Sequence, residues 1–189
     1  MALITYDPPE RFIAGTVGSP GQREFYLQAA SGARVTSVGV EKTQVSVLAD
    51  RINDLLDEFA GGAGGEQAAA AFADDGPLVT PVEEEFRVGT MGLSYDPDGA
   101  RLVLELHAVG DSFDTPDMEE LAQTGELDAD PADDPGQLVL RIGLPAGMAR
   151  AFARRAQQVV AAGRPQCPFC AGPIDPEGHI CPRANGYRR

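Results

Sequence analysis

The feature that most constrains this chain is a cluster of soft metal ligands near its C-terminus. All three cysteines and one of the two histidines form two short motifs, Cys167-x-x-Cys170 and His179-x-Cys181. Zinc prefers four nitrogen or sulfur ligands in a tetrahedron, and a Cys-x-x-Cys turn can present two thiolates to one ion. We therefore expect residues 164–189 to fold around a zinc ion, apart from a main domain formed by residues 1–163.

The two motifs differ in how strongly they indicate a metal. The Cys-x-x-Cys pair is common in zinc sites, whereas residues two apart on an extended strand stand ~6.5 Å apart, so His-x-Cys needs a turn. A redox-active pair or unliganded thiols are the alternatives, although redox pairs usually begin a helix and Pro173 argues against one here. Because four protein ligands leave no open position for water, the motifs predict a structural zinc without hydrolysis at the metal.

The composition indicates a folded and strongly acidic body. Hydrophobic residues make up 43% and charged residues 23% of the 189 positions, which suits one ordinary core with an appendage. The net charge is −14, and residues 164–189 carry +2, which leaves −16 on the remainder. Such a body repels phosphate backbones, so nucleic acid is an unfavourable partner for it.

The basic C-terminal end admits three interpretations. Arg183, Tyr187, Arg188 and Arg189 combine cations with an aromatic ring, which suits RNA through phosphate contacts and stacking. The same residues could dock on the acidic body of the chain or on a protein partner. The charge difference between the two parts favours docking or a protein partner over RNA.

The sequence also bears on location. The N-terminal residues contain neither the basic segment nor the apolar run of a signal peptide. No stretch approaches the ~20 apolar residues of a membrane span. An odd number of clustered cysteines fits a reducing compartment better than a disulfide framework. We expect a cytoplasmic protein without a membrane partner.

The hydrophobic pattern of the first half predicts strands followed by a helix. Alternating apolar positions and turn residues indicate strands over 11–18, 23–30 and 34–40. Helical spacing then predicts one amphipathic helix that ends at Gly61. Its apolar face is Val45, Leu48, Ile52, Leu55, Leu56 and Phe59.

The second half repeats this order after a Gly/Ala-rich connection. Residues 61–77 are expected to be a flexible connection, with a short helical piece over 67–72. A hairpin is predicted from strands over 83–96 and 101–110, then a strand over 136–144 and a helix over 145–163. Between them, residues 111–136 hold ten acidic residues and no basic one, so we expect flexibility there.

These elements predict an α+β fold, with mostly antiparallel sheet and two amphipathic covering helices. Residues 33–56 and 137–160 each read as a strand that runs directly into a helix. The similarity indicates a duplicated strands-then-helix unit, with chance resemblance as the alternative.

No catalytic constellation is evident. His107 beside Glu105, or the carboxylates at 83–85, could supply an acid and a base. A simpler interpretation is that His107 is a half-buried structural residue of a strand, and that the carboxylates are solvated residues at the start of one. Asp96-Pro-Asp98-Gly suits a hairpin turn better than a calcium loop. Phosphate-binding glycine loops, nucleophile elbows and HExxH patterns are missing from the sequence.

Three segments together resemble a conserved actinobacterial family of unknown function. They are YDPPERFIAGTVGSPGQREFYLQA, VEKTQVSVLADRINDLLDE and CPFCAGPIDPEGHICPRANGYRR, and the resemblance covers nearly the whole chain. The family is one of a trio whose other members resemble a histidine-type phosphatase and a phosphoinositide-kinase-like protein. The resemblance implies a shared pathway and possible partners, and it assigns no activity to this member.

Two classes of function follow from these observations. The first is a non-enzymatic adaptor or binding protein, whose zinc-stabilised tail presents a basic surface to a protein partner. The alternative is an enzyme or sensor that binds a small phosphorylated or nucleotide-like ligand in a sheet cleft, with contacts from His107, Arg11, Arg23, Arg87 or Arg141. RNA binding through the tail is a third and weaker hypothesis.

Overall fold

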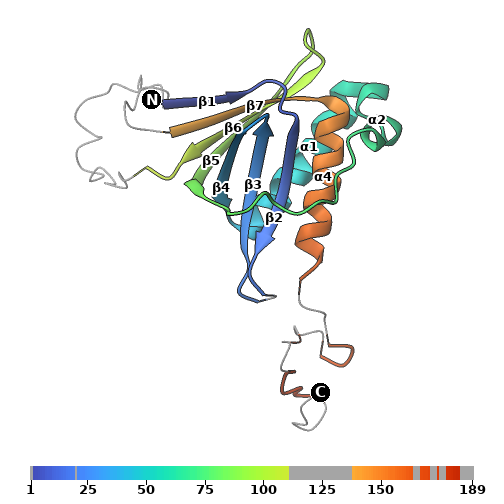
Figure 1. The fold of residues 1–189 in the computed structure, drawn as a ribbon. Coiled ribbons are helices and arrows are strands. Elements are labelled where there is room, and N and C mark those ends of the chain that lie inside the picture. The colour runs from blue at the N-terminus through green and yellow to red at the C-terminus, as the bar shows by residue number, and fades with distance from the viewer. Residues whose placement is uncertain are drawn as a thin grey trace, which may run out of the picture.

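One seven-stranded sheet joins the two halves of the chain. The computed structural model describes residues 2–19, 21–110, 138–163, 167–170, 174 and 178–183. The strand order is β1-β7-β6-β5-β4-β3-β2, and the helices lie on one face of the sheet (Figure 1). The strands are β1 Ala2–Tyr6, β2 Arg11–Val17, β3 Glu24–Ser31, β4 Arg34–Val40, β5 Glu84–Asp96, β6 Arg101–Ala108 and β7 Leu138–Pro145. The helices are α1 Lys42–Leu55, α2 Glu66–Ala70 and α4 Ala146–Ala161.

The sheet contains the same topological unit twice. Strands β2, β3 and β4 form an antiparallel meander that leads into α1, and β5, β6 and β7 form another that leads into α4. The two units meet where β4 pairs in parallel with β5. The predicted α+β fold, with its repeated strands-then-helix order, is therefore confirmed.

The core lies between the sheet and the helices, and it uses equivalent positions in both units. Leu27 pairs with Val38 in the first unit, and Leu104 pairs with Ile142 in the second. All four side chains are buried in one continuous hydrophobic cluster with the apolar stripes of α1 and α4. Since side chains alternate along a strand, the intervening residues point to the outer face of the sheet.

Helix α1 begins with a capping box and ends in a wider turn. The Glu41 side chain accepts a hydrogen bond from the backbone N–H of Gln44, and the Gln44 side chain accepts one from the backbone N–H of Glu41. These bonds satisfy N–H groups at the start of the helix that have no partner within it. A π-helical turn, Leu56–Ala60, follows α1, and Gly61 ends it with a φ of 50°. The wider turn rotates Phe59 off the predicted buried face, so its side chain is 54% exposed and stacks on Tyr95.

Strand β1 was not predicted from the sequence. Ala2–Tyr6 pairs in parallel with β7, and the register joins Ala2 to Leu138 and Tyr6 to Ile142. The Tyr6 hydroxyl lies 2.9 Å from the Thr36 hydroxyl on β4. The N-terminal strand therefore extends the second unit and also contacts the first.

The Gly/Ala-rich connection packs against the body. Residues 61–77 contain a short 3-10 helix, Gly61–Gly64, and then α2, close to the helical piece expected there. The Arg150 guanidinium on α4 donates to the Gly64 carbonyl at 2.7 Å and to the Asn53 side chain at 2.8 Å. Helix α4 therefore contacts the connection, and the flexibility expected from its composition stays a prediction.

Two further expectations concern parts of the chain that are only partly described. The acidic segment 111–136 lies outside the described residues, and so do residues 164–166, where the main domain was expected to end. The division at residue 163 stays a prediction. Among the described residues, no helix has the length and apolar character needed to cross a membrane.

Candidate functional site

The four predicted metal ligands converge on one point. The ligand atoms of Cys167, Cys170, His179 and Cys181 all lie within 4.8 Å of one another. The sulfurs of Cys167 and Cys181 are 3.8 Å apart, and the Cys170 sulfur is 3.3 Å from His179 Nε2. Four soft ligand atoms at such distances form a cluster that could hold a metal ion.

Two of the distances between ligand atoms are close to those expected around a tetrahedral ion. Thiolates at ~2.3 Å from a tetrahedral zinc stand ~3.8 Å apart, and a thiolate and an imidazole nitrogen stand ~3.6 Å apart. The separations of 3.8 Å and 3.3 Å in the cluster lie close to these values. No disulfide joins the three cysteines, all of which are among the described residues.

The environment favours metal binding by the first thiol, and the imidazole faces the cluster through Nε2. Burial raises the pKa of Cys167, but N–H groups of Cys170 and Phe169 and the neighbouring thiols outweigh it and lower this pKa to about 7. A lower pKa increases the fraction of thiolate, which is the form that binds metals. His179 directs Nε2 to the cluster, while its Nδ1 is buried without a hydrogen-bond partner among the described residues.

Apolar side chains flank the ligands on the surface of the tail. Phe169 lies between the first two cysteines and is 44% exposed, and Ile180, between His179 and Cys181, is 68% exposed. The Arg183 guanidinium donates to the Phe169 carbonyl at 3.2 Å, which links the two ligand motifs. Tyr187, Arg188 and Arg189 lie outside the described residues.

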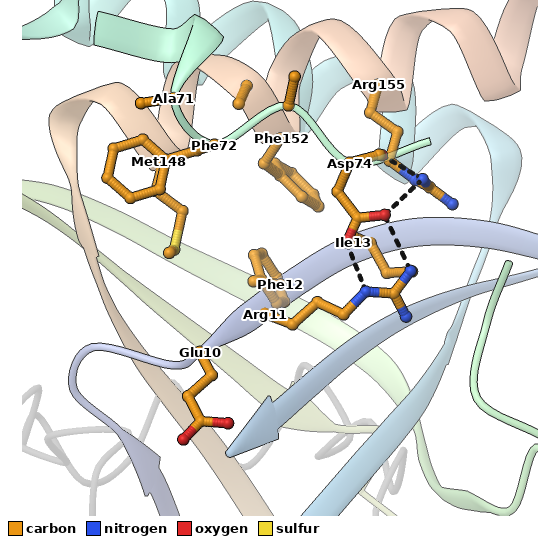
Figure 2. Close-up of a pocket in the computed structure, with 12 residues that line it drawn as sticks. Glu10, Arg11, Phe12, Ile13, Ala71, Phe72, Asp74, Met148, Phe152 and Arg155 are labelled. Carbon is orange, nitrogen blue, oxygen red and sulfur yellow. Dashed lines mark hydrogen bonds and ion pairs between the residues drawn. The ribbon is translucent and has the colours of Figure 1, made fainter. Parts of the chain in front are cut away.

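A second candidate site is a cavity of about 230 Å³ between β2, α4 and the 61–77 connection (Figure 2). Phe12 and Phe152 form its floor, where their rings stack at 4.5 Å. Phe72 and Met148 line one side, and Arg11 lies on the other (Figure 2). The cavity thus combines an apolar floor with a charged rim.

The charged rim is internally paired. Arg11 donates to both carboxylate oxygens of Asp74, at 2.5 and 3.0 Å, and the Gly76 N–H donates to the same carboxylate. The Arg11 hydrogen bond is the main reason that the pKa of Asp74 falls to about 2. Arg155 donates to the carbonyls of Ala14, Asp74 and Gly76, and burial lowers its pKa.

These contacts bring together residues far apart in the sequence. Arg11 and Asp74 are 63 positions apart, and Arg155 donates to a carbonyl 141 positions away. The rim fixes the end of the 61–77 connection to both β2 and α4. An anionic ligand would have to compete with Asp74 for Arg11.

The other arginines suggested for a ligand cleft do not join this site. Arg23 lines a separate cavity with Lys42, and Arg87 pairs with Glu41 and Glu84. Arg141 lies 3.5 Å from Glu105 on the outer face of the sheet.

The residues considered for acid–base chemistry do not form a pair either. Glu105 is engaged by Arg141, and His107 lies opposite Val139 and Thr90 in the sheet. Of the carboxylates at 83–85, Glu84 begins β5 and pairs with Arg87. The Asp96 carboxylate accepts the N–H groups of Asp98 and Gly99, as expected for a hairpin turn.

Sequence reasoning missed Asp74, Arg155 and Phe72 as site residues. The first and last lie in the connection that was expected to be flexible, and Arg155 lies on the predicted helix over 145–163 without an assigned role. A signal was nevertheless present, because two adjacent carboxylates at 74–75 precede Gly76 and Pro77, a sequence typical of a turn.

The comparisons with known proteins agree with the resemblance noted in the sequence. No curated protein and no solved structure shows significant similarity to this chain. A family model with the description "Protein of unknown function (DUF3090)" matches residues 4–181, a range that includes both sheet units, the cavity and all four metal-ligand candidates. The chain therefore belongs to this family of proteins of unknown function.

Proposed function

We propose that the protein is a non-enzymatic adaptor or binding protein, whose C-terminal tail is shaped by one structural zinc ion. The convergence of four soft ligand atoms within 4.8 Å carries this proposal. Zinc suits this donor set because thiolate and imidazole are its preferred ligands, and four of them close the tetrahedron. A closed site contributes folding free energy to a short segment that has little apolar core of its own.

The exposed surface of the tail supports a role in protein binding. Phe169 and Ile180 lie beside ligands and are 44% and 68% exposed, although large apolar side chains are usually buried. Arg183 adds a cation, so the tail offers an apolar and basic surface. A suitable partner would present an apolar site with carboxylates around it, and the phosphatase-like and kinase-like proteins of the trio are candidates.

The partner role is tested in a native host. The double substitution Phe169→Ser and Ile180→Ser should leave the metal content unchanged and abolish copurification of the partner. Cys181→Ser should reduce both. If deletion of residues 164–189 leaves the set of copurifying proteins unchanged, the tail does not bind the partner.

Small-ligand binding is the second candidate, and the cavity with Arg11 on its rim favours it. A phosphorylated or nucleotide-like ligand could place an apolar group on Phe12 and Phe152 and an anionic group near Arg11. A ligand panel should then raise the melting temperature of the wild type but not of Arg11→Ala. A panel without such a shift would remove this candidate.

We also infer a reducing compartment such as the cytoplasm. The gathering of all three cysteines at a candidate metal site supports this inference, because thiolates must remain reduced to bind zinc. Loss of the bound metal during fractionation under oxidising conditions, with retention under reducing conditions, would agree with it.

A further inference from the structure

The cavity that Arg23 and Lys42 share lies where the first unit of the sheet meets the end of α4. Its volume is about 260 Å³, and it is lined by Gly21, Arg23, Phe25, Lys42 and Gly163. Arg23 directly precedes β3, Lys42 is the first residue of α1, and Gly163 lies just beyond α4. The β2–β3 connection and the C-terminal end of α4 lie at the same end of the sheet (Figure 1).

Both cations of this cavity lack a counter-charge among the described residues. No hydrogen bond or ion pair joins Arg23 or Lys42 to another residue in the described part of the chain. The Arg23 guanidinium lies over the Phe25 ring, 5.9 Å from its centroid. Every other described arginine makes an ion pair or donates a hydrogen bond. In a chain with 29 acidic and 15 basic residues, two unpaired cations in one cavity call for a physical reason.

The carboxylates adjacent to these cations in the sequence are engaged elsewhere. Glu24 accepts a hydrogen bond from the Tyr26 hydroxyl at 3.0 Å. Glu41 pairs with Arg87 at 3.2 Å. The fold therefore separates each cation from the acidic residue beside it and turns both cations toward the same cavity.

The two cations converge on one point beside Gly163. A Cβ added to this glycine would lie 3.5 Å from Lys42 Nζ and 3.8 Å from Arg23 Nη2. Because Gly163 has no side chain, none of its atoms separates the two nitrogens. One small anion at this place can therefore accept hydrogen bonds from both the ammonium and the guanidinium.

We propose that this cavity binds the phosphate group of a small phosphorylated molecule. Lys42 contributes a point charge and Arg23 a planar set of donors, a combination that suits the several oxygens of a phosphate. Two cations also balance the two negative charges of a phosphate, whereas a single carboxylate would balance only one. The net charge of −14 repels nucleic acid, so the ligand is a small phosphate and not a polymer.

A charge effect on α4 is the competing explanation. The Val160 carbonyl lies 3.7 Å from the same point, and the C-terminal end of a helix attracts cations. A role confined to α4 predicts that phosphate has no effect on this cavity. The phosphate site is independent of the proposed zinc site, because its lining residues belong neither to the ligand cluster nor to the cavity beside Arg11.

The test uses the fact that Lys42 is the only lysine of the chain. Acetylation of its side chain by an N-hydroxysuccinimide ester is followed by mass spectrometry of peptides from the full-length protein. Inorganic phosphate is the probe, chloride at equal ionic strength is the control, and the α-amino group is the internal reference. We expect phosphate to slow the acetylation of Lys42 several-fold and saturably, without an equal effect on the reference.

Two variants separate a built site from general charge attraction. Arg23→Gln should weaken the protection by phosphate roughly tenfold, because a charged donor is lost. Gly163→Val keeps both cations and places a side chain between them, so it should also weaken the protection. Arg51→Ala, on the exposed side of α1, should match the wild type. Melting temperatures close to that of the wild type confirm that the variants are folded.

The proposal is overturned if millimolar phosphate protects Lys42 no better than chloride does. It is also overturned if Arg23→Gln and Gly163→Val are protected as well as the wild type. Glycerol 3-phosphate and phenyl phosphate, tested in parallel, identify the source of the phosphate group. Tighter protection by either ester supports a phosphorylated metabolite, and tighter protection by inorganic phosphate supports the free ion at the same site.

Discussion

The side-chain amide of Gln28 makes two hydrogen bonds with the backbone of Val79, at 3.1 and 2.8 Å. A third bond, at 2.9 Å, joins its nitrogen to the Ser37 hydroxyl. This buried amide therefore connects two strands to the extended residues 77–82, the strap. The stability of the first unit should depend on it.

Replacement of Gln28 by Leu should lower the free energy of unfolding by about 1–3 kcal/mol, because the part-buried backbone groups of Val79 lose their partner. Chemical denaturation with urea measures the change. Gln158→Ala, at an exposed position of α4, is the matched control and should remain within about 0.5 kcal/mol of the wild type. Equal stability of the Gln28 variant and the control would show that the strap is not held by this amide.

A substitution at Gly15 tests how closely Leu78 packs against this position. A Cβ at this position would lie 2.6 Å from Leu78 Cγ, so Gly15→Ala should displace the strap and cost about 1–3 kcal/mol of stability. The double variant Gly15→Ala and Leu78→Ala should recover part of this loss relative to the sum of the single changes, since the clash is absent. Strict additivity in this double-mutant cycle would contradict the contact.

The lowered pKa of Asp74 predicts that this residue makes a pH-dependent contribution to stability. Its pKa is lowered to about 2 in the folded protein, below the ordinary value of 3.8, mainly by the hydrogen bond from Arg11. The stabilisation is therefore complete above the unfolded pKa and is lost as the pH falls toward 2. The side chain of Asp74 is 32% exposed, so solvent screens the ion pair. The lowered pKa should therefore contribute about 1 kcal/mol to the free energy of unfolding.

The measurement compares the wild type with Asp74→Asn between pH 7 and pH 2.5. At pH 7 the variant should be less stable by about 1 kcal/mol, and the difference should shrink below pH 4. Asp54→Asn, whose carboxylate is exposed on α1, serves as the control. A stability difference that stays constant over this range would argue against a charge effect at Asp74.

Metal removal should affect only the tail. All four ligand candidates follow residue 163, and the main core contains none of them. Treatment with a strong chelator should therefore make residues 167–183 susceptible to proteolysis, while the melting temperature of the main domain changes by less than about 2 °C. Cooperative unfolding of the whole chain on chelation would mean that tail and body form one unit.

Local patterns explain what could be predicted from the sequence. The ligand cluster was identifiable because four soft ligands lie close together in the chain, and their spacing is itself chemical information. The helical stripe of Val45, Leu48 and Ile52 and the alternation in β3 are also properties of short segments. Each of these patterns is independent of distant residues.

The missed features all depend on distant partners. Strand β1 is five residues long without clear alternation, and its parallel partner β7 is more than a hundred residues away. The connection 61–77 has the composition of a flexible segment, but Arg11, Arg150 and Arg155 bind it from outside. Tertiary contacts thus determine these segments, and local propensity does not report them.

The most direct test of the account is the metal content of the untagged protein, purified without added metal, beside that of Cys181→Ser. We predict about one zinc per chain in the wild type and a clear loss in the variant, since one of four ligands is removed. A wild-type protein that carries no zinc, with thiols that titrate as free or as a Cys167–Cys170 disulfide, would contradict the structural metal site.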